Sequence, residues 1–493
     1  MTTAISASDF VHTLGVNTHL DFAAYGYENV AAVESAIRYL GLVNLRDSAE
    51  VPTDAALWQQ VAQATGAEFD DYIAETSPAG MAMDLGFVGQ LASEGILNAL
   101  EGGNEEDDAY PASLGNTLAA TAQFQRQVDS LGRQLGLPVV NMSFGSGWSA
   151  ANNWRGNYDK VGDLSAATDY ANAHTYPVAG QLPDDTIDRL NGLAHLAAPS
   201  RPVITTEIGW DESQGFSPAD IARYILDAAF DGIKYGNPKT YFYALYDDGS
   251  GRFGLMNPNG TAKPAGQALH NLTSILADSA PGAFHPGSLS YSLSSSDSTV
   301  LMQKSDGSFW LSVWNEHAAA HGATLTLGSA AQAIRLFDPL TGAAAGQATA
   351  GTSSFTFIVP DHPVVIEVAN SVVPPSGGGT GTPVTTPDSG SQHAAPVIAA
   401  PSGATVAAGK TVKLAATSIV DAWAAAAPGN LALNVTASSG ALTMQDASGA
   451  PAAGSGSRAI HLTGTLAQLD AALKSLSFTA ATANASVSLD VWD

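Results

Sequence analysis

The sequence predicts an α/β fold class: a (β/α)8 TIM barrel, followed by an antiparallel β-sandwich and a further all-β module. Three observations predict this organisation. Short apolar runs alternate with amphipathic segments from about residue 10 to 280, helical spacing then stops, and a stretch rich in Pro, Gly, Ser and Thr precedes the C-terminal part. We therefore expect a barrel over 1–280, a sandwich over 281–370, a linker over 371–394 and an all-β module over 395–493.

The first part of the chain has the alternation expected of strand–helix units. Apolar residues recur at helical spacing, as at Val30, Val33 and Ile37. A later helix has an explicit start, with Ser217 as the N-cap and Pro218 at the first helical position. Between these segments we expect eight strands, the number that closes such a barrel. The predicted strands end near Asn17, Arg46, Ile73, Glu105, Ser143, His174, Glu207 and Tyr246.

Strand-like runs replace the helical pattern beyond about residue 283. Phe309 to Trp314 is one such run, bounded by turn residues, as is typical of a small antiparallel sandwich. Trp310 and Trp314 alternate along it, so we expect them to be core residues. The linker cannot bury enough apolar surface to fold alone. Alternating stretches return after it, which predicts a surface or adhesin-like module.

The charge balance excludes several classes of partner. Lys plus Arg number 19 and Asp plus Glu number 46, giving a net charge of −27 that would repel nucleic acid. The apolar runs are too short for a membrane-spanning helix, so we expect no membrane insertion. The absence of cysteine excludes thiolate nucleophiles and Cys-ligated zinc. The N-terminus has neither the basic start nor the apolar stretch of a secretory signal peptide.

A cluster of carboxylates follows the fourth predicted strand. An apolar run ending at Leu100 leads into Glu101-Gly102-Gly103-Asn104-Glu105-Glu106-Asp107-Asp108. Repulsion raises the pKa values of neighbouring carboxylates, so at least one stays protonated near neutral pH, as a general acid must. A solvated acidic loop is the alternative interpretation.

A lone glutamate closes the seventh predicted strand. The β-branched run from Val203 ends on Glu207, where barrel enzymes do their chemistry. Two carboxylates on separate strands, facing one cleft, are the minimum set for cleaving a glycosidic bond. The structural alternative is that Glu207 forms an ion pair with Arg46 or Arg201.

These motifs resemble the clan A superfamily of retaining glycoside hydrolases, with family 39-like or family 5-like enzymes as the nearest. In that clan an Asn-Glu pair closes the fourth strand and a Glu closes the seventh. Asn104-Glu105 and Glu207 match these positions. The resemblance covers about residues 10 to 280 and continues into the sandwich.

Further positions carry the same resemblance. The clan often has an Arg on the second strand, which Arg46 matches, and a His-x-Tyr on the sixth, which His174-Thr175-Tyr176 matches. Two positions depart from the pattern. Gly103 replaces the Pro that often precedes Asn-Glu, and Tyr246 stands where Trp is usual at the end of the eighth strand.

The resemblance implies a role for each residue. Glu207 would attack the anomeric carbon while Glu105 protonates the leaving oxygen, and Glu105 would then activate water. Tyr176 would donate to Glu207, Arg46 would keep Glu207 ionised, and Asn104 would bind the sugar 2-hydroxyl. His174 would line the substrate site, with a satisfied strand-end histidine as the alternative.

Aromatic residues near the predicted catalytic face would bind the sugar, because C–H faces of sugars pack on aromatic rings. Trp148, Trp210 and Tyr246 are the candidates that we select. The implied reaction needs no cofactor, and we predict no metal site. The run Asp247-Asp248-Gly249-Ser250-Gly251 is compatible with calcium binding but is more typical of a turn.

These inferences predict a retaining glycosidase that hydrolyses β-glycosidic bonds in a polysaccharide or oligosaccharide. We expect it outside a bacterial cell or on its surface, without an N-terminal signal peptide in this form. Two alternatives stay open: a non-catalytic carbohydrate-binding or adhesin protein that keeps the barrel for recognition, and a transglycosylase that uses the same carboxylate pair.

Overall fold

The computed structural model of the chain describes residues 1–49, 52–73, 78–105, 118–145, 148–278, 284–348, 351–369, 397–399, 409–414, 418–420, 431–437, 439–446, 449–452, 455–481 and 487–492. The chain divides into two compact units, Met1–Ser376 and Gly377–Asp493. The first unit holds the barrel and the sheets that follow it. The predicted linker, 371–394, lies outside the described residues.

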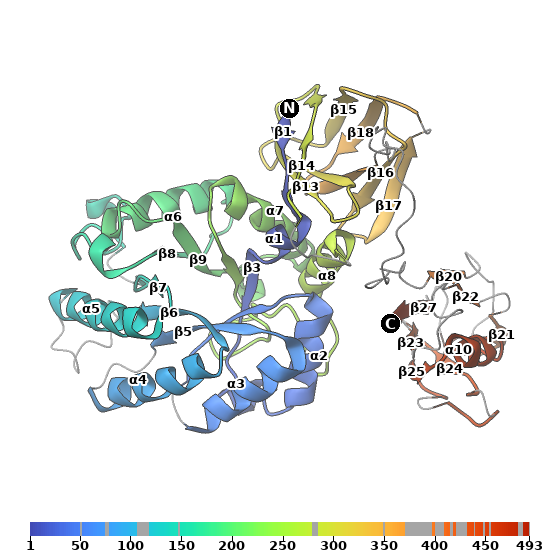
Figure 1. Cartoon of the computed structure of the whole chain (residues 1–493), viewed down its shortest axis with the longest axis horizontal. Helices are drawn as coiled ribbons and strands as arrows, with labels where there is room; N and C mark the ends of the chain where they lie inside the picture. Colours follow the sequence, from blue (N-terminus) through green and yellow to red (C-terminus); the bar gives the residue numbers. More distant parts are fainter. Residues whose placement is uncertain are drawn as a thin grey trace, which may run out of the picture. The chain divides into compact units, whose positions relative to one another are not determined.

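Eight parallel strands form the predicted barrel (Figure 1). They are β3 (Leu14–Asn17), β4 (Asn44–Asp47), β5 (Glu68–Ile73), β6 (Leu97–Gly103), β7 (Val139–Val140), β8 (Ala171–Thr175), β9 (Val203–Ile208) and β10 (Thr240–Phe242). Their order is β7-β6-β5-β4-β3-β10-β9-β8, and a parallel bridge between Val140 and Tyr170 joins the two end strands. The (β/α)8 prediction is therefore confirmed for this part of the chain.

In the described part of the barrel, seven α-helices surround these strands (Figure 1). Helix α7 begins as predicted, because the Ser217 side chain accepts the Asp220 N–H and Pro218 occupies the first turn. Helix α2 ends at Gly41, whose φ of 69° is the left-handed conformation that glycine adopts without strain. The seven helices are α2 (Val30–Leu40), α3 (Pro52–Thr65), α4 (Pro78–Ser93), α5 (Leu118–Leu135), α6 (Pro183–Ala197), α7 (Pro218–Lys234) and α8 (Pro264–Leu276).

The connection from β7 to β8 differs from the others. Its described residues contain two 3-10 turns, η2 (Ala150–Asn152) and η3 (Ser165–Ala167), and no α-helix. Both β7 and β10 also end earlier than predicted, so Ser143 and Tyr246 lie beyond the strands that we expected them to close. The long connection after β7 is therefore available to build one wall of a site at the carboxyl ends of the strands.

Further β-sheets follow the barrel. Their strands are β11 (Ser288–Leu289), β12 (Tyr291–Leu293), β13 (Ser298–Gln303), β14 (Phe309–Trp314), β15 (His321–Leu327), β16 (Ala333–Asp338), β17 (Ala343–Ala348), β18 (Ser354–Val359) and β19 (Val364–Ala369). One sheet has the order β12-β15-β18, and another contains β17-β16-β19-β14-β13.

The N-terminal residues correct one boundary of the domain prediction. Strands β1 (Thr2–Thr3) and β2 (Ile5–Ser6) were expected within the barrel, but they pair with β11 and β13 of the later sheets. The short helix α1 (Ala7–Val11) then leads into β3. The chain therefore enters the barrel from the sheets to which it later returns.

Strand β14 joins the barrel core to the core of the sheets. Leu311 and Val313 belong to a cluster made by both sheets, whereas Trp310 and Trp314 belong to the cluster of the barrel. The Trp314 indole N–H also donates to Asp231 of α7 over 2.9 Å. The expectation that both tryptophans are core residues is confirmed.

Carboxyl groups gather where α7 meets these sheets. Asp227 and Asp231 are fully buried, and Glu316 lies two residues after the end of β14. Burial, together with neighbouring acidic groups, raises the pKa values of Asp227 and Asp231 and raises that of Glu316 to about 7. This contact therefore favours protonated carboxyl groups.

The second unit has a core of its own, formed by residues such as Leu433, Leu473 and Phe478. It contains helix α10 (Leu466–Leu473), so the prediction of an all-β module is wrong in this respect. No helix among the described residues of either unit is both long and apolar enough to cross a membrane. The strands are β20 (Val397–Ala399), β21 (Thr411–Lys413), β22 (Ser418–Val420), β23 (Leu431–Ala437), β24 (Ala441–Thr443), β25 (Ala459–Gly464), β26 (Ser477–Thr479) and β27 (Val487–Trp492).

Candidate active site

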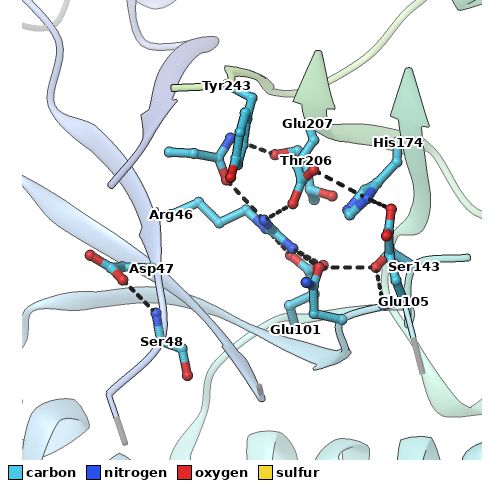
Figure 2. Close-up of polar contacts among 12 residues, drawn as sticks. Arg46, Asp47, Ser48, Glu101, Glu105, Ser143, His174, Thr206, Glu207 and Tyr243 are labelled. Atoms are coloured by element: carbon cyan, nitrogen blue, oxygen red, sulfur yellow. Dashed lines mark hydrogen bonds and ion pairs between the residues drawn. The ribbon is translucent and has the colours of Figure 1, made fainter. Parts of the chain in front are cut away.

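Arg46 of β4 lies at the centre of a polar cluster at the carboxyl ends of the strands (Figure 2). Its side chain is 1 % exposed. The guanidinium donates to both oxygens of Glu101, at 2.7 and 2.8 Å, and to Oε1 of Glu207 at 2.7 Å. It also donates to Asn17 at 2.8 Å and to Asn104 at 2.9 Å. Arg46 thus fixes four side chains from β3, β6 and β9 and their ends in one arrangement.

Glu207 comes from β9 and is nearly buried. The ion pair with Arg46, expected as the structural alternative, is present, and it is also the contact that keeps a carboxylate ionised. The Tyr176 hydroxyl donates to Oε2 of Glu207. Burial and the Glu207 charge raise the pKa of Tyr176, so its hydroxyl stays protonated and can donate. Glu207 is therefore held in one orientation as an anion.

Glu105 follows β6 and faces the same site. Its φ of 52° lies in the left-handed region, and its N–H donates to Oγ of Ser143 over 2.9 Å. The side chain is one-third exposed. Gly145 allows it to lie against the main chain, because a Cβ at that glycine would come within 2.6 Å of Glu105 Oε2. This local backbone therefore positions the carboxyl group rather than leaving it in solvent.

His174 bridges the two glutamates (Figure 2). Its Nδ1 lies 2.7 Å from Glu105 Oε1 and 3.4 Å from Glu207 Oε2. Burial lowers the pKa of His174, but the two carboxylates outweigh this effect and the net pKa is raised. Burial raises the pKa of Glu105, but His174 outweighs it and the net pKa is lowered. Nδ1 therefore carries a proton that it can share with Glu105.

This result corrects the expected state of Glu105. We predicted that neighbouring acids in the sequence would raise its pKa, whereas the dominant partner is His174 from another strand. The rest of the predicted acidic run, residues 106–108, lies outside the described residues.

From the sequence, Glu101 was placed in the acidic cluster but was assigned no role in the site. Glu101 is fully buried and pairs with Arg46, and Asn172 donates to its Oε1 over 2.8 Å. Tyr72 covers the other side of Arg46, with its ring centroid 4.3 Å from the guanidinium carbon. The sequence did carry a signal for this role. Glu101 is a charged residue directly after an apolar run, and a barrel strand buries every side chain that points inward.

Two cavities meet at Glu105. The smaller, of about 380 Å³, is lined by Glu207, Asn104, Tyr72, His19 and Tyr243, among others. The larger, of about 690 Å³, contains Trp148, Trp154, Phe144, Arg189 and His174 but not Glu207. Tyr176 lines both cavities, as Glu105 does. The structure therefore places Trp148 on the wall of the site.

Trp210 and Tyr246 lie elsewhere, which corrects their selection as substrate-binding residues. Both are almost fully buried in the barrel core, Trp210 against Tyr224 and Tyr246 against Tyr27. After the eighth strand, Tyr243 and Phe253 line the smaller cavity, and the Tyr243 hydroxyl donates to Asp248 over 2.6 Å. For Tyr246 the error follows from the early end of β10, which shifts the residue that faces the site.

The residues present offer limited means of holding a metal. Glu105, His174 and Glu207 each offer one ligand atom, and these atoms lie within 4.8 Å of one another. A hydrogen bond already joins His174 to Glu105, and an ion-pair contact of 3.4 Å joins it to Glu207. In the turn predicted as the alternative to a calcium loop, Asp248 accepts the N–H of Ser250 and Asp247 pairs with Lys263. Both carboxylates are thus satisfied as in an ordinary turn.

The arrangement offers a nucleophile and a proton donor in one cleft. Glu207 is an oriented anion and a candidate nucleophile, and Glu105 exchanges a proton with His174. One carboxylate oxygen of Glu105 lies within 4.8 Å of one of Glu207. The two groups therefore face the same small volume.

The chain was compared with known proteins. No protein-family model and no curated protein matches it. A family 39 glycoside hydrolase from Bacteroides cellulosilyticus WH2 shares 14 % identity at a TM-score of 0.52, over 74 % of this chain and 82 % of the other. A monomeric beta-xylosidase from Caulobacter crescentus CB15 shares 12 % identity at 0.51, over 75 % and 98 %. CelM2, a bifunctional glucanase-xylanase from a metagenome library, shares 12 % identity at 0.50, over 75 % and 97 %.

These likenesses concern the fold. They extend over three quarters of this chain, which is more than the barrel alone. The fold implied by the resemblance to clan A glycoside hydrolases is therefore confirmed.

Proposed function

We propose that the chain is a retaining glycoside hydrolase that cleaves β-glycosidic bonds in an oligosaccharide or polysaccharide by double displacement. The observation that carries this proposal is the placement of Glu105 and Glu207, whose nearest oxygens lie within 4.8 Å. Retaining enzymes hold their two carboxyl groups about 5 to 5.5 Å apart, whereas inverting enzymes need about 6.5 Å or more. The short separation supports direct attack by one carboxylate.

In the first step, the Glu207 carboxylate attacks the anomeric carbon and the bond from that carbon to the leaving oxygen breaks. The leaving oxygen takes a proton from Glu105. Arg46 and Tyr176 hold Glu207 through one contact on each oxygen, so the attacking lone pair keeps its direction. The partial burial of Glu207 reduces the solvent that must be displaced.

His174 supplies the proton that Glu105 needs. In the resting site the imidazolium shares its Nδ1 proton with Glu105 Oε1 over 2.7 Å. Substrate that covers Glu105 removes water from this carboxyl group, and loss of solvation favours its protonated form. The proton then moves to Glu105, and His174 becomes a neutral imidazole that accepts from it.

In the second step, water attacks the anomeric carbon and the bond to Glu207 breaks. Glu105, which is now ionised, takes a proton from that water. Esterification has removed the charge of Glu207, and the carboxylate returns when the ester is cleaved. Asn104, which Arg46 fixes by its amide oxygen, directs its amide nitrogen toward a hydroxyl of the sugar in this proposal.

In this proposal the two cavities bind different parts of the substrate. The smaller contains both glutamates and would hold the sugar that is transferred. The larger contains Glu105 without Glu207, so it would hold the leaving group. Substrate on both sides of the cleaved bond supports action on a chain of sugars. We further propose that the sheets after the barrel form an accessory β-sandwich and that the protein works outside the cell or on its surface.

The proposal is tested by screening the intact chain against a panel of polysaccharides and aryl β-glycosides, followed by proton NMR of the first-formed product. The expected product is the β-anomer, and activity should disappear in Glu207→Ala. An α-anomer formed first would contradict the retaining mechanism. Near-normal activity of Glu207→Ala would contradict the assignment of the site. An added acceptor sugar separates hydrolysis from transglycosylation.

A further inference from the structure

The larger cavity has a strained aromatic wall. Trp154 is 55 % exposed, and both it and Asn153 have a φ of 56°. Among the described residues, Glu105, Asn153 and Trp154 are the non-glycine residues with positive φ, and all three line this cavity. This backbone conformation is unfavourable for residues that carry a side chain, and it is concentrated at binding and active sites. The exposed Trp154 indole is therefore a candidate surface for stacking a ligand.

Arg189 of α6 lies beside this surface. Its Nη1 donates to the Trp154 carbonyl over 3.2 Å, which ties the helix to the strained loop. The remaining guanidinium donors have no partner within the described part of the chain, and no described carboxylate lies within ion-pair distance. The chain has 46 acidic and 19 basic residues. Most of its described surface arginines form an ion pair with an acidic side chain, and Arg189 does not.

The charges of the two cavities differ. Arg189 is the one arginine or lysine among the described residues that line either cavity. The smaller cavity carries Asp211 as well as the two glutamates, whereas Glu105 is the single described carboxylate of the larger one. The carboxylates of the smaller cavity therefore disfavour an anionic sugar there. The larger cavity offers the Arg189 guanidinium as a partner for an anionic sugar.

We propose that the larger cavity binds a sugar that carries a carboxylate, which makes the leaving-group side of the substrate a uronic acid residue. The ring of this sugar would stack on Trp154, and its carboxylate would accept hydrogen bonds from Arg189. A guanidinium suits this role because its planar donors bind both oxygens of a carboxylate together. The assignment of this cavity to the leaving group rests on the proposed function, but the binding of a carboxylated sugar does not.

The test is a binding measurement that needs no turnover. Saturation-transfer NMR at low ionic strength would give the Kd of the intact chain for D-glucuronate, D-galacturonate and D-mannuronate and for the neutral parents glucose, galactose and mannose. We expect at least one uronate to bind about three- to tenfold more tightly than its parent, the range of a partly exposed charge-assisted contact. Added salt should reduce this preference, because the contact is solvent-accessible.

Variants identify the residues responsible. Arg189→Gln should remove the preference for the uronate, and Arg189→Lys, which keeps a charge and a donor, should retain part of it. Trp154→Ala should weaken binding of the uronate and of its parent alike. Arg155→Gln is the matched control: Arg155 is on the same loop but pairs with Asp159 and does not line the cavity, so the preference should persist.

Two results would overturn the proposal: equal binding of every uronate and its parent by the wild-type chain, or a preference that survives Arg189→Gln. These outcomes are distinct from failure of the proposed function. A uronate preference without glycosidase activity would support the binding site and contradict the proposed function. Activity on β-glycosides without a uronate preference would support the proposed function and contradict the binding site.

Discussion

Arg46 is the residue on which the order of the site depends most. It makes five hydrogen bonds to Glu101, Glu207, Asn104 and Asn17 while almost fully buried. A lysine would keep the charge but could not reproduce the planar set of donors. The buried ion pair with Glu101 is costly to break, because the remaining charge would have no partner.

We predict that Arg46→Met destabilises the chain by about 3 to 5 kcal/mol, the usual cost of leaving a buried charge unpaired. Adding Glu101→Gln should recover part of this loss, since the stranded charge is then removed. Denaturant unfolding of the wild type, both single variants and the double variant measures the coupling. A loss below about 1 kcal/mol in Arg46→Met would show that the pair does not organise the site.

His174 provides a second prediction at this scale. The wild-type site loses its catalytic proton at the raised pKa of His174, above the ordinary value of 6.5. In His174→Asn that proton resides on Glu105 alone, and a carboxyl group releases it at lower pH. The basic limb of the kcat/KM profile should therefore move to lower pH by about one unit or more.

The exposed His195 gives the matched control, because it lies on α6 and hydrogen-bonds only to a main-chain carbonyl among the described residues. His195→Asn should leave the profile unchanged. A basic limb that stays in place in His174→Asn would remove His174 from the proton path.

Short motifs predicted most of this cluster, but not its partners. Glu105, Glu207 and Arg46 stand at predicted strand ends, where side chains converge. Glu101 was given no role because it lies two residues before the end of β6, and only the closed barrel makes it face inward. The effect of His174 on Glu105 was also beyond the sequence, since the two residues are far apart along the chain.

At the scale of elements, β5 carries a carboxyl group into the barrel interior. Asp70 is fully buried, and neither of its oxygens has a hydrogen-bond partner among the residues that the structure describes. Burial raises its pKa to about 7, and the nearby Glu101 charge acts in the same direction. Between its unfolded value of 3.8 and this value, the folded state holds more protons than the unfolded state. The free energy of unfolding should therefore fall as the pH rises from about 4 to 7.

Asp70→Asn removes this titration without changing the shape of the side chain. The gain in the free energy of unfolding over wild type should be small at pH 4 and should grow by roughly 2 to 4 kcal/mol by pH 8. Chemical unfolding across this pH range checks it, with the exposed Asp188→Asn as a control for the loss of one surface carboxylate. A gain that is constant with pH would mean that Asp70 does not titrate in this range.

The elements of the barrel were predictable because strands and helices have different apolar periods. The connection after β7 was less predictable from the sequence. Its described part has two 3-10 turns in place of a helix, and it carries Trp148 and Trp154 to the larger cavity. Loops owe their shape to what they pack against, so no local pattern predicted that these two residues would share a wall.

At the scale of the whole molecule, the barrel and the following sheets form one unit. Strand β14 is buried on both faces, and β1 and β2 bring the N-terminal residues into the sheets. The pairing of β1 and β2 was not predicted, since two-residue strands carry no recognisable period. The sheets therefore contribute side chains to the apolar core of the barrel and are not a loosely attached appendage.

This organisation predicts opposite results for two truncations. A chain ending near residue 370 should stay soluble and keep full kcat on a short soluble glycoside, because the first unit is intact and every candidate catalytic residue lies within it. A chain ending near residue 280 should aggregate, since it exposes the barrel surface that Trp310 and Trp314 cover.

Soluble yield and kcat of the two products check this prediction. A soluble, active chain ending near 280 would show that the sheets are dispensable for the barrel. Loss of activity on the small glycoside after the cut near 370 would show that the second unit takes part in the reaction.

In the proposed function, Glu207 is the nucleophile and Glu105 the acid and base of one retaining site. Azide tests both roles in one measurement, because it attacks without needing a base. With an activated aryl β-glycoside, azide should restore turnover of Glu105→Ala and give the β-glycosyl azide, formed from the intact glycosyl-enzyme. The same treatment of Glu207→Ala should give either no rescue or the α-azide. A β-azide from Glu207→Ala, or an α-azide from Glu105→Ala, would contradict the assignment.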